Sequence, residues 1–178
     1  EWKPTPEYSK LRRFRTMPTL FDQLVKWGIP VEKEQRICGT FAVFDFESLQ
    51  KKENLPNSTT STSYVNRQVA FCYSINSTVP GHDKPFCVRD EDSEWLIQKF
   101  VEDLLNISEA ASALERRRMR SIFERLDEKI VECDIMEEET DDEALLAYYD
   151  LQRKSYERLR GRLEHRCDQL VVYSYNGS

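Results

Sequence analysis

Two acidic side chains in the sequence Asp45-Phe46-Glu47 have the type and spacing that a divalent-cation site requires. Residues i and i+2 of a β-strand point to the same face, so both carboxylates are expected to face one spot. A buried carboxylate is costly unless it is paired or coordinates a metal, and no Lys or Arg follows the motif before Lys51. Mg²⁺ and Mn²⁺ prefer such oxygen ligands. The same residues also fit a strand end at which Glu47 simply turns to solvent.

Three strands are predicted around this acidic motif. Residues 40–46 are rich in aromatic and β-branched side chains, which favours a buried strand that ends at the motif. A polar, Ser/Thr-rich loop at 51–63 separates it from a second strand over 69–75, and a short third strand is predicted over 86–88. The period of two places one set of second-strand side chains on a single face: Val69, Phe71, Tyr73 and Ile75. The short links between these strands predict an antiparallel meander.

A helical pattern follows the strands. Asp92 or Ser93 is expected to cap the first helix. Thr140 and Glu143 have the spacing of a capping box, which predicts that the surrounding acidic patch opens the last long helix. Apolar residues recur at helical spacing in both long segments. We therefore expect a long helical-hairpin insertion at about 109–167.

The two ends of the chain complete the predicted architecture. Residues 1–36 form a lead-in that contains a short amphipathic helix ended by Gly28, and a last strand is predicted over 170–175. The order β-β-β, helices, β indicates one α/β domain with a mixed sheet over 37–178. The chain begins at Glu1 rather than Met, so we expect it to be cut from a longer protein.

Composition narrows the class of protein. The chain has 178 residues and a net charge of -6, which argues against a broad basic face as the main contact with nucleic acid. An enzyme that reaches phosphates through metal ions is still allowed. No apolar run approaches the roughly 18 residues of a membrane span, so no membrane partner is expected. Five scattered cysteines without a C-x-x-C pair predict no zinc site but reduced thiols in an intracellular compartment. Nucleus, mitochondrion and cytoplasm are not distinguished.

Arginines and tyrosines in the predicted hairpin are a second place where DNA or a protein primer could bind. Helical aromatic stripes usually belong to the core, and Arg runs are usually solvated, here with Glu115 and Glu124 as helical-spacing partners. We therefore predict no site there. The residues concerned are Arg116, Arg117, Arg118, Arg120, Tyr148, Tyr149 and Tyr156.

Two terminal segments of the predicted sheet resemble motifs of a known family. Residues 41–48, Phe-Ala-Val-Phe-Asp-Phe-Glu-Ser, resemble the first exonuclease motif of family B DNA polymerases. Residues 173–178, Tyr-Ser-Tyr-Asn-Gly-Ser, are similar to the start of the second motif. The closest resemblance is to the protein-primed organellar and viral branch, which includes polymerases of Polinton/Maverick-type transposons. Segments 72–81, 84–88 and 165–172 are similar as well, so the resemblance covers about 37–178.

The resemblance implies a ribonuclease-H-like mixed sheet and removal of mismatched 3′ ends by two-metal catalysis with Mg²⁺ or Mn²⁺. Asp45 matches the carboxylate that bridges both ions, and Glu47 matches the ligand that also places the attacking water. Ser48 matches a position where a Thr usually contacts the primer terminus, and Asn176 matches the Asn that holds the frayed single strand. The implied partners are a single-stranded 3′ end, primer-template DNA, deoxynucleotides in the parent protein and a terminal-protein primer.

Departures from the family leave three hypotheses. The family completes its metal site with one Asp shortly after the position of Ser178 and another in a later Tyr-containing motif, and neither Asp is present here. With two of the four expected carboxylates, this chain is expected to be inactive alone. Tyr175-Asn176 also stands where Phe-Asn is common. The main hypothesis is a polymerase exonuclease domain. The alternatives are a stand-alone 3′-5′ nuclease and a host-adopted, catalytically inactive interaction module.

Overall fold

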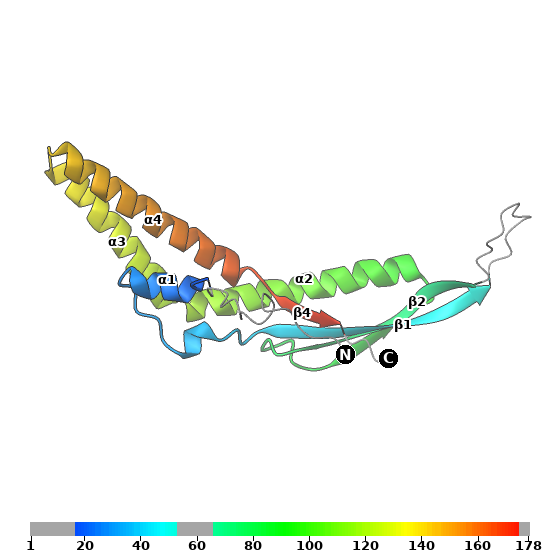
Figure 1. Cartoon of the computed structure of the whole chain (residues 1–178). Helices are drawn as coiled ribbons and strands as arrows, with labels where there is room; N and C mark the ends of the chain where they lie inside the picture. The colour runs from blue at the N-terminus through cyan, green and yellow to red at the C-terminus, as the bar shows by residue number, and fades with distance from the viewer. Residues whose placement is uncertain (1–16, 53–65, 175–178) are drawn as a thin grey trace, which may run out of the picture.

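The computed structural model describes residues 17–52 and 66–174, in which three strands, the long helices and a last strand follow each other in the order that the sequence predicts (Figure 1). Among these residues, every helix is too short or too polar to span a lipid bilayer. The elements in chain order are α1 (Leu20–Lys26), a 3₁₀ turn (Glu34–Arg36), β1 (Phe41–Lys52), β2 (Asn66–Ser77), β3 (Phe86–Arg89), α2 (Ser93–Arg118), α3 (Arg120–Glu139), α4 (Glu143–Cys167) and β4 (Val171–Ser174).

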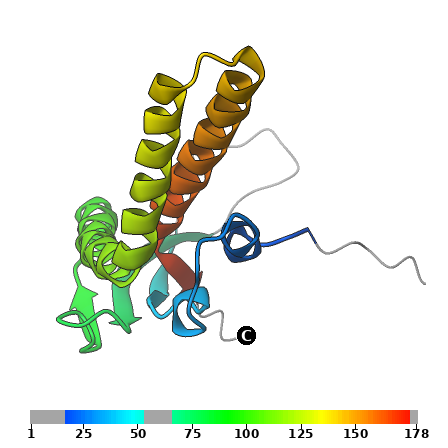
Figure 2. The same cartoon turned by 90° about the vertical axis from the view of Figure 1, so that its left-hand side faces the viewer.

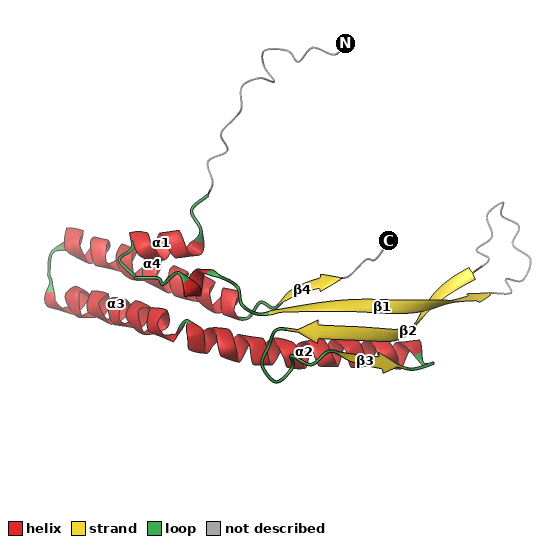
Figure 3. Ribbon diagram, turned by 90° about the horizontal axis from the view of Figure 1, so that it is seen from below, coloured by secondary structure: helices red, strands yellow, loops and turns green. Residues whose placement is uncertain are grey.

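The four strands form one mixed sheet in the order β3-β2-β1-β4. β2 is antiparallel to both β1 and β3, which confirms the predicted meander. β4 returns after the helices and pairs in parallel with β1, so it forms the edge of the sheet. The predicted α/β class with a mixed sheet is therefore confirmed. Figure 3, seen from below, shows α2 behind the sheet and no described helix in front of it.

A core between the sheet and α2 holds these two layers together. Tyr73 and Ile75 of β2 are buried against Leu96 and Ile107 of α2. The hydroxyl of Tyr73 donates a hydrogen bond of 2.6 Å to Asp103 of α2. This contact satisfies the one polar atom that Tyr73 carries into an otherwise apolar layer.

A β-bulge corrects the predicted face of β2. Glu47 lies opposite Cys72, but its neighbour Ser48 lies opposite Ala70, so Phe71 is an extra residue on β2. Before the bulge, the side chains of β2 therefore point to the faces opposite to those that a continuous period of two predicts. Ala70, rather than the predicted Val69, packs on the sheet core. The prediction that Val69 and Phe71 share the face of Tyr73 was therefore wrong.

A second core lies in the α3–α4 hairpin, which Figure 2 shows rising away from the sheet. Leu126 of α3 and Leu163 of α4 are fully buried in it. The lead-in helix α1 also belongs to this core, because Phe21 and Leu24 are buried there. α1 ends as predicted before Gly28, whose φ of +78° suits glycine.

Two helix ends differ from or refine the sequence prediction. Asp92 caps α2 as expected, because its carboxylate accepts hydrogen bonds from the backbone N–H groups of Glu94 and Trp95 in the first turn. The cap of α4 is Asp142, whose carboxylate accepts from the N–H of Ala144. Thr140 instead accepts from the N–H of Asp142, so the predicted capping box was wrong. The acidic patch is consequently split between the end of α3 and the start of α4.

Three of the four arginines around the α2–α3 junction are ion-paired rather than simply solvated, and the fourth, Arg117, is exposed. Arg116 binds Asp168 with an N–O distance of 2.8 Å, and Arg120 binds Glu124 at 2.8 Å. Arg118 pairs with the buried Glu115 at 3.2 Å. Two of these three pairs use the glutamates that helical spacing predicts, whereas Asp168 comes from beyond α4.

Candidate functional site

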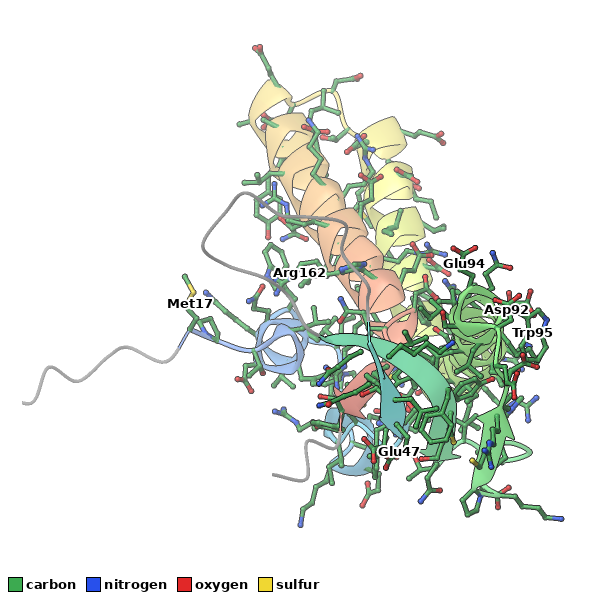
Figure 4. All side chains as sticks on the ribbon, turned by 90° about the vertical axis from the view of Figure 1, so that its right-hand side faces the viewer. Met17, Glu47, Asp92, Glu94, Trp95 and Arg162 are labelled. Carbon is green, nitrogen blue, oxygen red and sulfur yellow. The ribbon has the colours of Figure 1, made fainter. Side chains whose placement is uncertain are left out.

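Asp45 and Glu47 lie on the face of the sheet that α2 does not cover. Phe44 and Phe46, the intervening residues of β1, pack on the core beneath α2. Alternation along the strand therefore directs both carboxylates to the opposite face, as predicted. Figure 4 shows Glu47 on the lower side of the sheet, away from the start of α2 marked by Asp92 and Trp95. Their Cα atoms are about 6.6 Å apart along the strand.

The surroundings of the two carboxylates differ from the expected buried strand end. β1 continues to Lys52, so the acidic pair lies in mid-strand. Asp45 is half-buried and Glu47 is exposed. Neither side chain forms a hydrogen bond or an ion pair with any described residue. Desolvation therefore does not force a cation onto this pair, but two neighbouring carboxylates that form no ion pair still favour one.

The neighbouring strands define what else reaches the site. Asp45 lies opposite Ser74 of β2. On the other side, Ser174 at the end of β4 is opposite Phe44, the residue before Asp45. The parallel pairing thus places the end of β4 beside β1, one residue before Asp45.

Neither of the other two predicted site residues is found beside the carboxylates among the described residues. Ser48 pairs with Ala70, which packs on the sheet core, so alternation turns Ser48 to the face opposite the carboxylates. Asn176 lies outside the described residues. The roles of both residues in contacting DNA stay predictions.

Beyond Glu47, the same face carries a pocket of about 270 Å³. Leu49 and Phe71 line it, together with Arg89, whose guanidinium lies over the Phe71 ring at 5.5 Å from the centroid. On the β4 side, Phe41 and Tyr173 form an exposed edge-to-face pair with ring centroids 6.0 Å apart. Exposed aromatic rings therefore flank the acidic pair on the β4 side, and on the other side lies a pocket whose lining mixes apolar residues with the charged Lys51, Arg89, Asp90 and Glu91.

The described residues contain no cluster of three or more His, Cys, Asp or Glu side chains that could hold a metal ion. Asp45 and Glu47 are thus a two-carboxylate site within these ranges. Two carboxylates suffice to hold Mg²⁺ or Mn²⁺ only when water or substrate phosphate completes the coordination, which is the usual arrangement for Mg²⁺.

A pair of thiols beside Glu47 was not anticipated from the sequence. The Sγ atoms of Cys72 on β2 and Cys87 on β3 are 3.0 Å apart, and all five cysteines are free. The hydrogen bond with Cys87, burial and the negative charge of Glu47 together raise the pKa of the Cys72 thiol to about 11. No local spacing could have signalled this pair, because only the register of β2 with β3 brings the two residues together.

The thiol pair makes a testable prediction about reactivity. Only the thiolate is alkylated, and a raised pKa lowers its fraction below that of an ordinary cysteine at pH 8. Cys87→Ala removes the largest cause of the shift, so we expect iodoacetamide to alkylate Cys72 about tenfold faster in this variant. Peptide mass spectrometry over a time course measures the rate, with Cys38→Ala as the control. Equal Cys72 rates in the two variants would contradict the assignment.

The chain was compared with protein-family models, with curated proteins and with solved structures. None of the three comparisons gives a significant match.

Proposed function

We propose that this chain is the amino-terminal part of a protein-primed family B DNA polymerase and carries the first half of a two-metal 3′-5′ exonuclease site. The observation that carries the proposal is the position of Asp45 and Glu47. They share the uncovered face of the four-stranded sheet, and neither forms an ion pair with any described residue. The order of elements along the chain, three strands, helices and a fourth strand, is also the order that a ribonuclease-H-like fold implies.

The position of β4 supports the same proposal. Its pairing with β1 ends with Ser174 opposite Phe44. In the family, the segment after this strand supplies the next acidic ligand and the Asn that holds the frayed strand. A parallel neighbour of β1 is the arrangement that lets such residues meet Asp45 without crossing the sheet.

In two-metal hydrolysis the protein mainly supplies carboxylates that hold the metal ions in position. Bound divalent ions would supply charge neutralisation and an activated water for hydrolysis of the terminal phosphodiester. Asp45 would hold the ions from the centre of β1, and Glu47 would hold one ion and orient the water. The unpaired state of both carboxylates keeps their oxygens available for these roles.

A metal titration of this chain tests the proposal. We expect weak Mn²⁺ binding, with a dissociation constant on the order of 1 mM, because only two protein ligands are present. Asp45→Ala should remove this binding in isothermal titration calorimetry. Asp83→Ala is the matched control, since Asp83 is exposed and has no partner among the described residues. Identical titrations of the wild type and Asp45→Ala would exclude the metal site and favour the inactive interaction module.

A further inference from the structure

A basic groove lies between α1 and the second half of α4, away from the acidic pair. It has a volume of about 430 Å³, and α4 contributes most of its lining. Figure 4 shows Arg162 on the side of α4 that faces α1. The lining residues of α4 and its end are Arg158, Gly161, Arg162, His165, Arg166 and Gln169.

The arginines of this groove are not neutralised by acids of the described residues. Arg158, Arg162 and Arg166 form no ion pair with any described residue. The other arginines of α4 are paired, because Arg153 binds acids of α3 and α4, and Arg160 binds Asp127 at 2.6 Å. The acid on the facing helix is also engaged, since Asp22 binds Arg36 at 2.9 Å. Although the chain has a net charge of -6, this groove thus holds a row of three arginines without an ion-pair partner in the described part of the chain.

Contacts from α1 hold two of the three guanidinium groups in place. Arg162 donates to the side-chain oxygen of Gln23 at 2.5 Å. The Arg166 guanidinium lies 4.8 Å from the centre of the buried Phe21 ring. The arginines follow each other at intervals of four residues, so they lie on one face of α4 with a rise of about 6 Å per step. Such a row of positioned charges suits a ligand with regularly repeated anions.

Gly161 is a second, independent feature of the groove. It stands in the interior of a helix of 25 residues, where glycine is among the least favourable residues. Packing does not require it, because a Cβ at this position would meet no atom within 4 Å. A helix surface without a side chain, between Arg158 and Arg162, lets a bulky ligand approach the backbone closely.

We propose that this groove binds the sugar-phosphate backbone of DNA. The inference rests on the proposed polymerase function, which supplies DNA as the polyanion. The groove also leads toward the acidic pair. Gln169 at its end lies two residues before β4, and β4 runs along β1 to the level of Asp45. A DNA strand held by the arginines would therefore reach the sheet at its β4 edge, next to β1 and its two carboxylates.

DNA binding by matched double variants tests the groove. The probe is a fluorescein-labelled 20-nucleotide single strand, followed by anisotropy in EDTA, so the result does not depend on the metal site. Arg158→Ala/Arg162→Ala should weaken binding at least tenfold at low salt. It should also reduce the slope of log affinity against log salt by about 1.4, for two lost phosphate contacts. The control Arg117→Ala/Arg125→Ala removes the same charge at exposed sites outside the groove and should change affinity less than twofold.

A third variant separates binding from folding. Gly161→Leu places a good helix former in the groove, so we expect unchanged or higher thermal stability together with several-fold weaker DNA binding. Equal loss in the two double variants, or full binding by Gly161→Leu, would overturn the proposal. A Glu-rich peptide that binds the groove more tightly than DNA would overturn it in favour of an acidic protein partner. If the Mn²⁺ titration shows no binding, the proposed metal site fails, but the DNA-binding result for the groove is unaffected because that assay contains EDTA.

Discussion

Asp45→Ala is expected to abolish removal of a mismatched 3′-terminal nucleotide by the full-length polymerase of which we propose this chain is part. Asp45 lies at the centre of β1 with its carboxylate on the uncovered face, where the proposed site requires a ligand shared by both ions. Loss of metal-based stabilisation costs several kcal/mol in the transition state, which corresponds to a rate decrease on the order of 1,000-fold. Degradation of a 5′-labelled mismatched primer, without nucleotides and with Mg²⁺, measures this rate.

Two controls make this result specific. Nucleotide addition to a matched primer should change less than twofold, because we assign the two carboxylates to the proposed exonuclease site and not to a polymerisation site. Asp83→Ala should leave both activities unchanged. Degradation by Asp45→Ala at the wild-type rate would show that the catalytic site lies elsewhere. If the degradation rate falls but nucleotide addition falls equally, the variant has damaged the fold rather than the site.

The elements of the sheet were predictable because their signals are local. Alternating aromatic and β-branched residues indicate β1 and β2, and Asp92 marks the start of α2. The register was not predictable, since the bulge at Phe71 depends on how β2 pairs with β1. One extra residue reverses which side chains face the core, and no periodicity within β2 records it.

For the helices too, the sequence predicts which side is apolar but not which of its residues are covered by other elements. Ile122 and Leu126 of α3 and the second half of the α4 stripe, including Tyr156, are buried as helical spacing predicts, whereas Leu145 and Tyr148 near the start of α4 are exposed. On α2, however, Leu96 is buried whereas Trp95 and Val101 are about half exposed. Periodicity indicates a broad apolar side, but the contact with the sheet selects the residues that are covered. The docking of α1 on the hairpin likewise follows from packing that no local pattern specifies.

The site follows from the sequence only in part. The period of two correctly places Asp45 and Glu47 on one face, but it does not say whether that face is covered. No described element covers it, which explains why Glu47 is exposed. The arginine groove was missed because Arg158, Arg162 and Arg166 look like ordinary solvated helix charges in the sequence. Only the position of α1, and the engagement of the nearby acids, distinguishes them.

Arg118→Met is expected to destabilise the protein by about 2–4 kcal/mol, because it leaves the buried carboxylate of Glu115 without its counter-charge. Arg118 also ties the segment before β1 to the junction of α2 and α3. Its guanidinium donates to the carbonyl of Ile37, and its own carbonyl accepts from Gln35 at 3.2 Å. The fit is close, since a Cβ on Gly39 would lie 3.1 Å from the Arg118 Nη1 atom.

Urea unfolding followed by far-ultraviolet circular dichroism measures this cost. Arg120→Met is the matched control, because it breaks a helical pair with Glu124 that is well exposed and should cost less than about 0.5 kcal/mol. Glu115→Gln/Arg118→Met should recover at least half of the loss, since it leaves no charge buried. Equal losses for Arg118→Met and Arg120→Met would mean that Glu115 is effectively solvated. Recovery in the double variant would instead show that the loss in Arg118→Met comes from the uncompensated buried charge of Glu115.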